Sequence, residues 1–289
     1  MADGHNGLLI APTGSGKTYA LMGGIAKDAQ QRQTPSGGLR VLWITPLRAL
    51  ARDIADALQR LSEGVGLGWE VELRLGDTSS SIKARQRKKL PEILVTTPES
   101  LHVMMSYPGS EVLLRDIQCV VIDEWHDLIV SKRGVMVQLA LARLHSLSQD
   151  MKVWGISATI GNPTSAMSTL LAAQTRPTIL IQDTRPKQIR LETVIPENID
   201  NFPWAGHLGD SQIRQVRDII MNNQSTLVFT NTRNQSETWY RKLLSAEPDL
   251  AGQLALHHSS LASDQRTWVE HALHEGKLKA VICTSSLDL

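Results

Sequence analysis

Residues 8–18 read LLIAPTGSGKT, and this stretch decides the class of fold. Its apolar start, Leu8–Ala11, predicts a buried strand, and the residues after the glycines open a helix. Gly14 and Gly16 let the backbone turn its N–H groups toward an anion, and the start of the helix adds partial positive charge. The stretch therefore predicts a phosphate-binding P-loop, with Ala11 at the position where the usual pattern has its first glycine.

The P-loop interpretation gives the polar residues of this stretch separate tasks. Lys17 would reach the β- and γ-phosphates of a nucleotide, and the Thr18 hydroxyl would ligate Mg²⁺. The other predicted phosphate contacts come from Thr13, Gly14, Ser15 and Gly16. Because a P-loop alone leaves kinases, ATPases and GTPases open, further motifs have to decide among them.

The composition of the 289 residues is that of a globular protein, with 42% hydrophobic and 20% charged residues. The chain is long enough for two domains. It lacks the apolar runs of a transmembrane helix and the features of a secretory signal, so we expect a cytoplasmic protein without a membrane partner. Because the formal net charge is only +1, binding to a polyanion requires local basic patches. Cys119 and Cys283 lie in apolar runs and are predicted to be reduced core thiols.

Short apolar runs alternate with helix-like stretches, a pattern that favours mostly parallel sheets covered by helices on both faces. In the first part the predicted strands are Leu8–Ala11, Leu39–Thr45, Glu70–Arg74, Ile93–Thr96, Cys119–Ile122, Val153–Ser157 and Thr178–Gln182. In the second part they are Thr226–Thr230, Gln253–His257 and Ala280–Thr284. The pattern loosens over residues 183–203, where Arg190–Ile195 alternates like an exposed strand. We therefore predict one α/β domain over residues 1–182 and a second over residues 183–289, with a binding cleft between them.

Two carboxylates directly follow the predicted strand Cys119–Ile122. Ligands of parallel sheets bind at the carboxyl ends of the strands, where Asp123 and Glu124 are expected. Asp123 would hold Mg²⁺, and Glu124 would orient or deprotonate an attacking water. The alternative is a surface pair that opens a helix and is stabilised by its dipole, but the P-loop in the same chain favours the catalytic interpretation.

The acidic pair begins the stretch DEWH at 123–126, and Ser157-Ala158-Thr159 follows at the end of another predicted strand. The P-loop, DExH and SAT motifs in this order resemble the first RecA-like domain of a superfamily-two helicase. Further stretches that resemble motifs of this superfamily are residues 45–50, 76–78, 96–101, 227–233 and 282–289. The tryptophan of DEWH, SATIGN at 157–162 and FPWAGHLG at 202–209 resemble the large helicase-related (Lhr-like) group, and within it the ligase-associated DNA-damage-response DExH-box helicases.

This resemblance implies two tandem RecA-like P-loop domains, the second incomplete, with ATP and Mg²⁺ as cofactors. It also implies 3′-to-5′ translocation on single-stranded DNA, a role in DNA repair, and a DNA ligase and a nuclease as partners. The catalytic residues that it implies are Lys17, Asp123, Glu124 and His126. Ser157 and Thr159 would couple the ATP state to domain position. The implied nucleic-acid contacts are Thr45, Arg48, Thr97, Ser100, Thr230, Arg233 and Thr284.

The chain starts close to the P-loop and ends within the stretch that resembles motif V. We therefore expect a sequence truncated at both ends, without the family's upstream adenine-side segment and without motif VI. An arginine that reaches the transferred phosphate contributes about 10³- to 10⁵-fold to the rate in related GTPases. We accordingly expect these residues to bind Mg·ATP and to hydrolyse it slowly. An ATP-gated nucleic-acid clamp without unwinding and an RNA helicase of the same fold are open alternatives.

The basic stretch Ile82–Lys89 is expected to be a solvated helix face, with a contribution to nucleic-acid binding as the alternative. Trp43 and Trp154 fall inside predicted strands and are assigned to the core. Trp125 and Trp204 are predicted to be exposed or interfacial.

Overall fold

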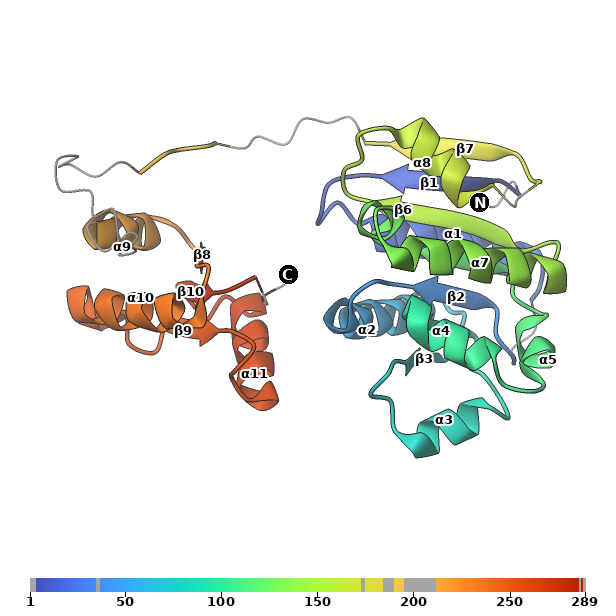
Figure 1. Cartoon of the computed structure of the whole chain (residues 1–289), viewed down its shortest axis with the longest axis horizontal. Coiled ribbons are helices and arrows are strands. Elements are labelled where there is room, and N and C mark those ends of the chain that lie inside the picture. Colours follow the sequence, from blue (N-terminus) through green and yellow to red (C-terminus); the bar gives the residue numbers. More distant parts are fainter. Residues whose placement is uncertain are drawn as a thin grey trace. The chain divides into compact units, whose positions relative to one another are not determined.

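The computed structural model describes residues 4–34, 37–172, 175–183, 190–194, 212–285 and 287. The chain divides into two compact units, residues 1–187 and 188–289, each with its own sheet (Figure 1). The α/β class expected from the alternating pattern is confirmed in both units. The domain boundary predicted after residue 182 lies near this division and stays a prediction.

The first unit is built on a seven-stranded sheet in the order β3-β4-β2-β5-β6-β1-β7, and every neighbouring pair is parallel. Its strands are β1 (Asn6–Ile10), β2 (Val41–Ile44), β3 (Val71–Arg74), β4 (Ile93–Thr96), β5 (Cys119–Ile122), β6 (Lys152–Ser157) and β7 (Thr178–Gln182). Its helices are α1 (Lys17–Gln31), α2 (Arg48–Gly64), α3 (Ser80–Gln86), α4 (Pro98–Met105), α5 (Ser110–Leu114), α6 (Trp125–Ile129), α7 (Lys132–Leu147) and α8 (Pro163–Leu170).

The central strands are apolar on both faces because helices cover both faces of the sheet. In β2, Leu42 and Ile44 join a core cluster with residues of α4, α6, α7 and α8, whereas Val41 and Trp43 join a second cluster with residues of α1 and α2. In Figure 1, α4 and α7 lie in front of the sheet and α1 and α2 behind it. The core assignments of Trp43 and Trp154 are confirmed, since these side chains are 0% and 1% exposed.

The second unit has a three-stranded parallel sheet in the order β8-β10-β9. Its elements are α9 (Ile213–Asn222), β8 (Thr226–Phe229), α10 (Arg233–Ala246), a 3₁₀ turn (Pro248–Leu250), β9 (Leu254–His257), α11 (Ser263–His274) and β10 (Ala280–Cys283). Successive side chains of β10 point to opposite faces of this sheet, so Ile282 packs into one hydrophobic cluster and Val281 into another. The exposed strand predicted over Arg190–Ile195 is wrong for residues 190–194, which have no strand partner in the described part of the chain.

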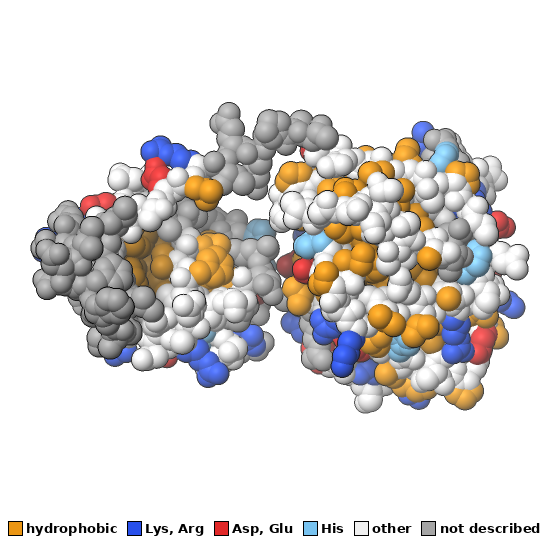
Figure 2. Space-filling model, turned by 45° about the horizontal axis from the view of Figure 1, so that its top comes forward, with side chains coloured by type: hydrophobic (Ala, Val, Ile, Leu, Met, Phe, Trp, Pro, Cys, Tyr) orange, Lys and Arg blue, Asp and Glu red, His pale blue; other side chains and the backbone are white. Residues whose placement is uncertain are grey.

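The surface charges and the two cysteines can now be placed in the structure. Lys and Arg side chains lie at several separate places on the visible face of the first unit (Figure 2). Cys119 and Cys283 are free and buried, as predicted. Among the described residues, no helix combines the length and the apolar character needed to cross a membrane.

Candidate functional site

Three predicted motifs meet at the carboxyl edge of the first sheet. The P-loop follows β1, Ser157 ends β6, and Asp123 follows β5. In the sheet, β6 lies directly between β5 and β1. The Ala11 N–H donates to the Ser157 carbonyl at 3.1 Å, so the P-loop starts in hydrogen-bond contact with the SAT stretch. The order of the parallel strands therefore brings together residues that are more than a hundred positions apart in the sequence.

The P-loop is an exposed, preformed turn. Gly14 and Gly16 have φ angles of 77° and 84°, in the left-handed region that L side chains rarely adopt, and Gly16 caps α1. The Lys17 ammonium folds back and donates to the carbonyls of Ala11 at 2.8 Å and Pro12 at 3.1 Å. Burial lowers the pKa of Lys17, while the charges of Glu124 and Asp123 oppose this shift. The loop thus presents a helix start to solvent with a lysine folded back beside it, an arrangement that fits a phosphate group.

The first carboxylate of DEWH is held from two sides. Asp123 is 5% exposed and accepts hydrogen bonds from the Trp43 indole at 3.3 Å and from the Glu124 N–H at 2.9 Å. Burial and the neighbouring Glu124 charge raise the pKa of Asp123 to about 6, against the effect of these two donors and of Lys17. A buried carboxylate with a raised pKa and a nearby lysine is a suitable ligand for a divalent cation, whose charge would offset the desolvation. Asp123 and Thr18 are the residues that would hold Mg²⁺ here.

Glu124 links the acidic pair to Ser157. Its backbone is left-handed, with φ 46° and ψ 49°, a conformation that is uncommon outside glycine and is often found at functional sites. Glu124 Oε2 lies 3.3 Å from His126 Nδ1, and the same nitrogen lies 3.2 Å from Ser157 Oγ. The Ser157 hydroxyl also reaches the Thr159 carbonyl at 3.4 Å, while Thr159 itself is exposed. The His126 imidazole therefore contacts both Glu124, a predicted catalytic residue, and Ser157, a predicted coupling residue.

The structure corrects the interpretation of Trp125. This side chain was expected to be exposed or interfacial, but it is 0% exposed and donates its indole N–H to the Ala166 carbonyl at 3.0 Å. Trp125 therefore anchors α6 against α8 and holds the residues on either side of it in place. Trp204 lies outside the described residues.

The predicted nucleic-acid contacts of the first unit differ in accessibility. We expected the Thr45 side chain to contact nucleic acid at the surface, but it is 0% exposed. Thr97 is 5% exposed and caps α4: its Oγ1 accepts from the Ser100 N–H at 3.4 Å and lies 3.2 Å from Ser100 Oγ. Ser100 is half-buried at the same helix start. Thr97 thus caps the start of α4. For Arg48 the structure describes only the backbone, at the first residue of α2.

Arg133, which no motif identified, connects these stretches. Its Nε donates to Glu99 Oε1 at 2.6 Å, and its Nη1 donates to the Pro46 carbonyl at 3.2 Å. Glu99 lies in the first turn of α4, next to the Thr97 cap, and Pro46 follows Thr45. One guanidinium therefore fixes the starts of two segments that the sequence predicts to contact nucleic acid.

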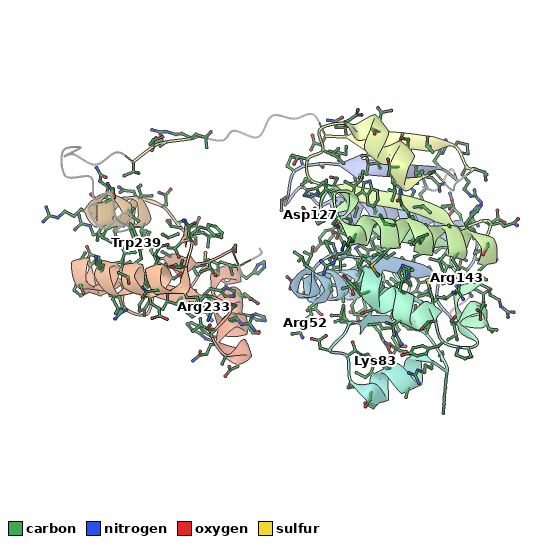
Figure 3. All side chains as sticks on the ribbon, viewed as in Figure 1. Arg52, Lys83, Asp127, Arg143, Arg233 and Trp239 are labelled. Carbon is green, nitrogen blue, oxygen red and sulfur yellow. The ribbon has the colours of Figure 1, made fainter. Side chains whose placement is uncertain are left out.

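The predicted contacts of the second unit also cluster at strand ends. The Thr230 N–H donates to the Cys283 carbonyl at 2.8 Å, and the Thr284 N–H donates to the His257 carbonyl at 3.2 Å. Thr230 Oγ1 lies 2.6 Å from Ser236 Oγ in α10. The Arg233 guanidinium, labelled in Figure 3, donates to Ser260 Oγ. The sheet therefore gathers Thr230 and Thr284 at one edge, as the parallel pattern predicts.

A parallel sheet with a phosphate loop after one strand, an acidic pair after another and a hydroxyl residue on the strand between them defines a RecA-like P-loop unit. Residues 1–167 match the family described as DEAD/DEAH box helicase, and the chain belongs to this family.

The most informative relatives are helicases of the Lhr type. The chain is 33% identical to the ATP-dependent helicase Lhr-Core of Methanocaldococcus jannaschii, over 99% of this chain and 35% of that protein. It is 30% identical to the Lhr helicase/uracil glycosylase of Escherichia coli, over 100% of this chain and 22% of that protein. The solved structure of the Mycobacterium smegmatis helicase Lhr with ssDNA and AMP-PNP aligns with a TM-score of 0.79 and 31% identity, over 100% of this chain and 38% of that one. The chain thus spans about a third of the archaeal relative.

Proposed function

We propose that this chain is the nucleotide- and nucleic-acid-binding core of an ATP-dependent helicase that moves along single-stranded DNA. One observation carries the proposal: the P-loop, DEWH and SAT stretches lie on adjacent strand ends, with His126 Nδ1 3.3 Å from Glu124 Oε2 and 3.2 Å from Ser157 Oγ. The residues proposed to hydrolyse the nucleotide and the residue proposed to transmit its state, Ser157, therefore belong to one cluster.

Mg·ATP would be held by the P-loop and the buried carboxylate. The N–H groups of the exposed residues 13–16 would bind phosphate oxygens, and Lys17 would exchange its bonds to the Ala11 and Pro12 carbonyls for bonds to the β- and γ-phosphates. When bound, Mg²⁺ neutralises charge on the transferred phosphate. Glu124 would orient or deprotonate the attacking water, because it is the carboxylate next to the predicted metal ligand and its Oε2 has no hydrogen-bond partner among the described residues.

Ser157 and Thr159 would transmit the state of the nucleotide. A shift of Glu124 upon binding or hydrolysis changes what His126 Nδ1 contacts, and Ser157 is the other group within reach of that nitrogen. The Ser157 carbonyl also accepts a hydrogen bond from the N–H of Ala11 in the P-loop. A shift of the P-loop and a shift of Glu124 would therefore both affect the end of β6. This supports the coupling role that we predicted from the SAT motif.

Single-stranded DNA is the proposed substrate because the M. smegmatis Lhr structure contains ssDNA and is 31% identical to this chain. The start of α4, where Thr97 and Ser100 lie, would contribute N–H and hydroxyl donors to a phosphate. Thr230, Arg233 and Thr284 stay predicted contacts of the second unit. An RNA substrate and an ATP-gated clamp without unwinding stay the alternatives.

Nucleic-acid-stimulated ATPase activity of the full-length protein tests the proposal. We expect Lys17→Ala to abolish nucleotide binding, and Glu124→Gln to keep binding but reduce turnover by at least about a hundredfold. Asp56→Asn, at an exposed position of α2, is the matched control and should retain full activity. An unchanged turnover in Glu124→Gln would reject the hydrolytic role, and matched DNA and RNA strands in the same assay would decide the substrate.

The remaining expectations are finer proposals with tests of their own. The 3′-to-5′ direction is checked by unwinding of duplexes with a single 3′ or 5′ tail. A role in DNA repair with a ligase and a nuclease is checked by co-purification of these enzymes with the full-length protein. Slow turnover of residues 1–289 alone would be contradicted by strong DNA-stimulated ATPase activity of that fragment.

A further inference from the structure

A second concave site lies at the β3 edge of the first sheet. It has a volume of about 250 Å³, and α3, α4 and α5 contribute to its walls. Its polar lining consists of Arg74, Gln86, Arg87, Tyr107 and Ser110, and its apolar lining includes Leu90, Met104, Leu113 and Leu114. In Figure 3 the label of Lys83 marks helix α3 beside it. Five strand spacings separate β3 from β1, or about 24 Å, so the pocket is distinct from the P-loop.

Two guanidinium groups share the ring of Tyr107 in this pocket. The carbon Cζ of Arg87 lies 4.0 Å from the ring centroid and that of Arg74 lies 5.8 Å from it. Arg74 is 2% exposed, and its Nη1 donates to Gln86 Oε1 at 3.1 Å. Burial and the neighbouring Arg87 lower the pKa of Arg74.

The partners that these two arginines have among the described residues are neutral. Neither arginine forms an ion pair with a described Asp or Glu. The nearby acid Glu72 is already used, since Arg85 pairs with Oε1 and the Gln86 amide donates to Oε2 at 2.8 Å. Gln86 therefore bonds both Arg74 and Glu72 and lies between them. A buried cation without a counter-ion is costly, and an anion bound in the pocket would relieve that cost.

The remaining walls decide which anion fits. The buried side chains of Leu90, Met104 and Leu114 are 2%, 4% and 1% exposed, and they suit an apolar group. The volume of about 250 Å³ is near the lower end of the range for ligand pockets and suits a small molecule. A guanidinium can bind a carboxylate through two parallel hydrogen bonds, and the apolar side chains that line the same pocket suit the rest of a small organic acid.

We propose that this pocket binds a small organic carboxylate with an aromatic or branched apolar group, as a ligand site separate from the proposed ATP site. Arg74 and Arg87 bind the carboxylate, and the leucines and Met104 enclose the apolar part. The site combines buried apolar side chains with two arginines, Arg74 buried and Arg87 exposed, and a mainly apolar lining with a few polar groups is the usual composition of a small-molecule pocket.

Calorimetric titration of the full chain with benzoate tests the proposal. We expect saturable binding at millimolar concentration or tighter, no binding of the neutral isostere benzamide, and no binding of inorganic phosphate at the same concentration. Arg87→Gln, at an exposed position, should weaken benzoate binding by about tenfold, because one charge-assisted hydrogen bond is lost. Lys88→Gln, on the neighbouring exposed residue outside the pocket lining, is the matched control and should bind as the parent does.

A second measurement places the ligand. With ¹³C-methyl-labelled methionines, benzoate should shift the Met104 resonance and leave that of Met22, which lies in the other core cluster, unchanged. Mg·ADP should not alter benzoate affinity, since the two sites are at opposite parts of the sheet. The proposal is overturned by absent benzoate binding, by equal binding of benzamide or phosphate, by equal affinity in Arg87→Gln, or by competition from Mg·ADP.

Discussion

The ion pair between Asp28 and Lys152 gives the sharpest test of how the P-loop helix is held. Asp28 lies in α1 and Lys152 begins β6, and their Oδ1 and Nζ atoms are 2.6 Å apart. The two side chains are 11% and 2% exposed. Asp28 Oδ1 also accepts from Arg32 Nε at 3.1 Å, but the Arg32 side chain is 44% exposed. The buried lysine therefore depends on Asp28, whereas Asp28 has a second, solvated partner.

This asymmetry predicts unequal costs for the two single substitutions. Asp28→Ala leaves a buried ammonium without a counter-ion and should reduce the free energy of unfolding by about 3–5 kcal/mol. Lys152→Met keeps the length of the side chain and leaves Asp28 paired with Arg32, so it should cost no more than about 1–2 kcal/mol. The double variant should lose less than the sum of the two, since it leaves no buried charge.

Urea unfolding followed by tryptophan fluorescence measures these costs, because Trp43, Trp69 and Trp154 are buried in the first unit. In a domain of this size the Asp28→Ala change corresponds to a melting-temperature loss of roughly 6–20 °C. Gln149→Ala, at an exposed position three residues before Lys152, is the control and should leave the transition unchanged. Equal costs for the two single substitutions, or strict additivity in the double variant, would refute the reasoning.

Three further predictions follow from particular contacts. Arg133→Ala removes the bonds to Glu99 and to a neighbouring carbonyl, so it should weaken ssDNA binding about two- to tenfold in fluorescence anisotropy while leaving nucleotide affinity unchanged; an equal loss of both would contradict a role at the α4 start. Burial raises the pKa of Cys119 to about 12 and that of Cys283 to about 11, so iodoacetamide, which needs the thiolate, should label neither at pH 8 until urea unfolds its unit; rapid native labelling would show that the strand is open. Gly16→Ala forces a side chain into a φ of 84°, so it should cost about 1 kcal/mol of stability and abolish ATP binding in a filter assay, and full ATP affinity would show that the turn tolerates a Cβ.

Most of the fold could be predicted because its signals are local. Short runs of four to seven residues, most of them apolar, predicted the strands of both sheets, and Ile93–Thr96, Cys119–Ile122 and Thr178–Gln182 match residue for residue. The exception, residues 190–194, shows that alternation alone is weak evidence for a strand when no neighbouring strand offers hydrogen bonds.

The candidate site divides in the same way. Its members could be found from the sequence because each motif follows a predicted strand, and parallel strands end at one edge. The accessibility of these residues could not be predicted from the sequence, because burial depends on what packs against a residue. Thr45 and Trp125 were expected at the surface and are both 0% exposed. The buried Trp125 indole donates a hydrogen bond to the carbonyl of Ala166, 41 positions away.

Local periodicity and short motifs were enough to predict the class of fold, most strand positions and the residue types of the proposed nucleotide site. Which of these groups contact one another could be seen only in the folded chain. It placed His126 between Glu124 and Ser157, brought Arg133 to a carbonyl 87 positions away, and gathered Arg74 and Arg87 over one tyrosine ring. The physical reason is that hydrogen bonds and ion pairs need contact within a few ångströms, and packing of distant segments alone sets such distances.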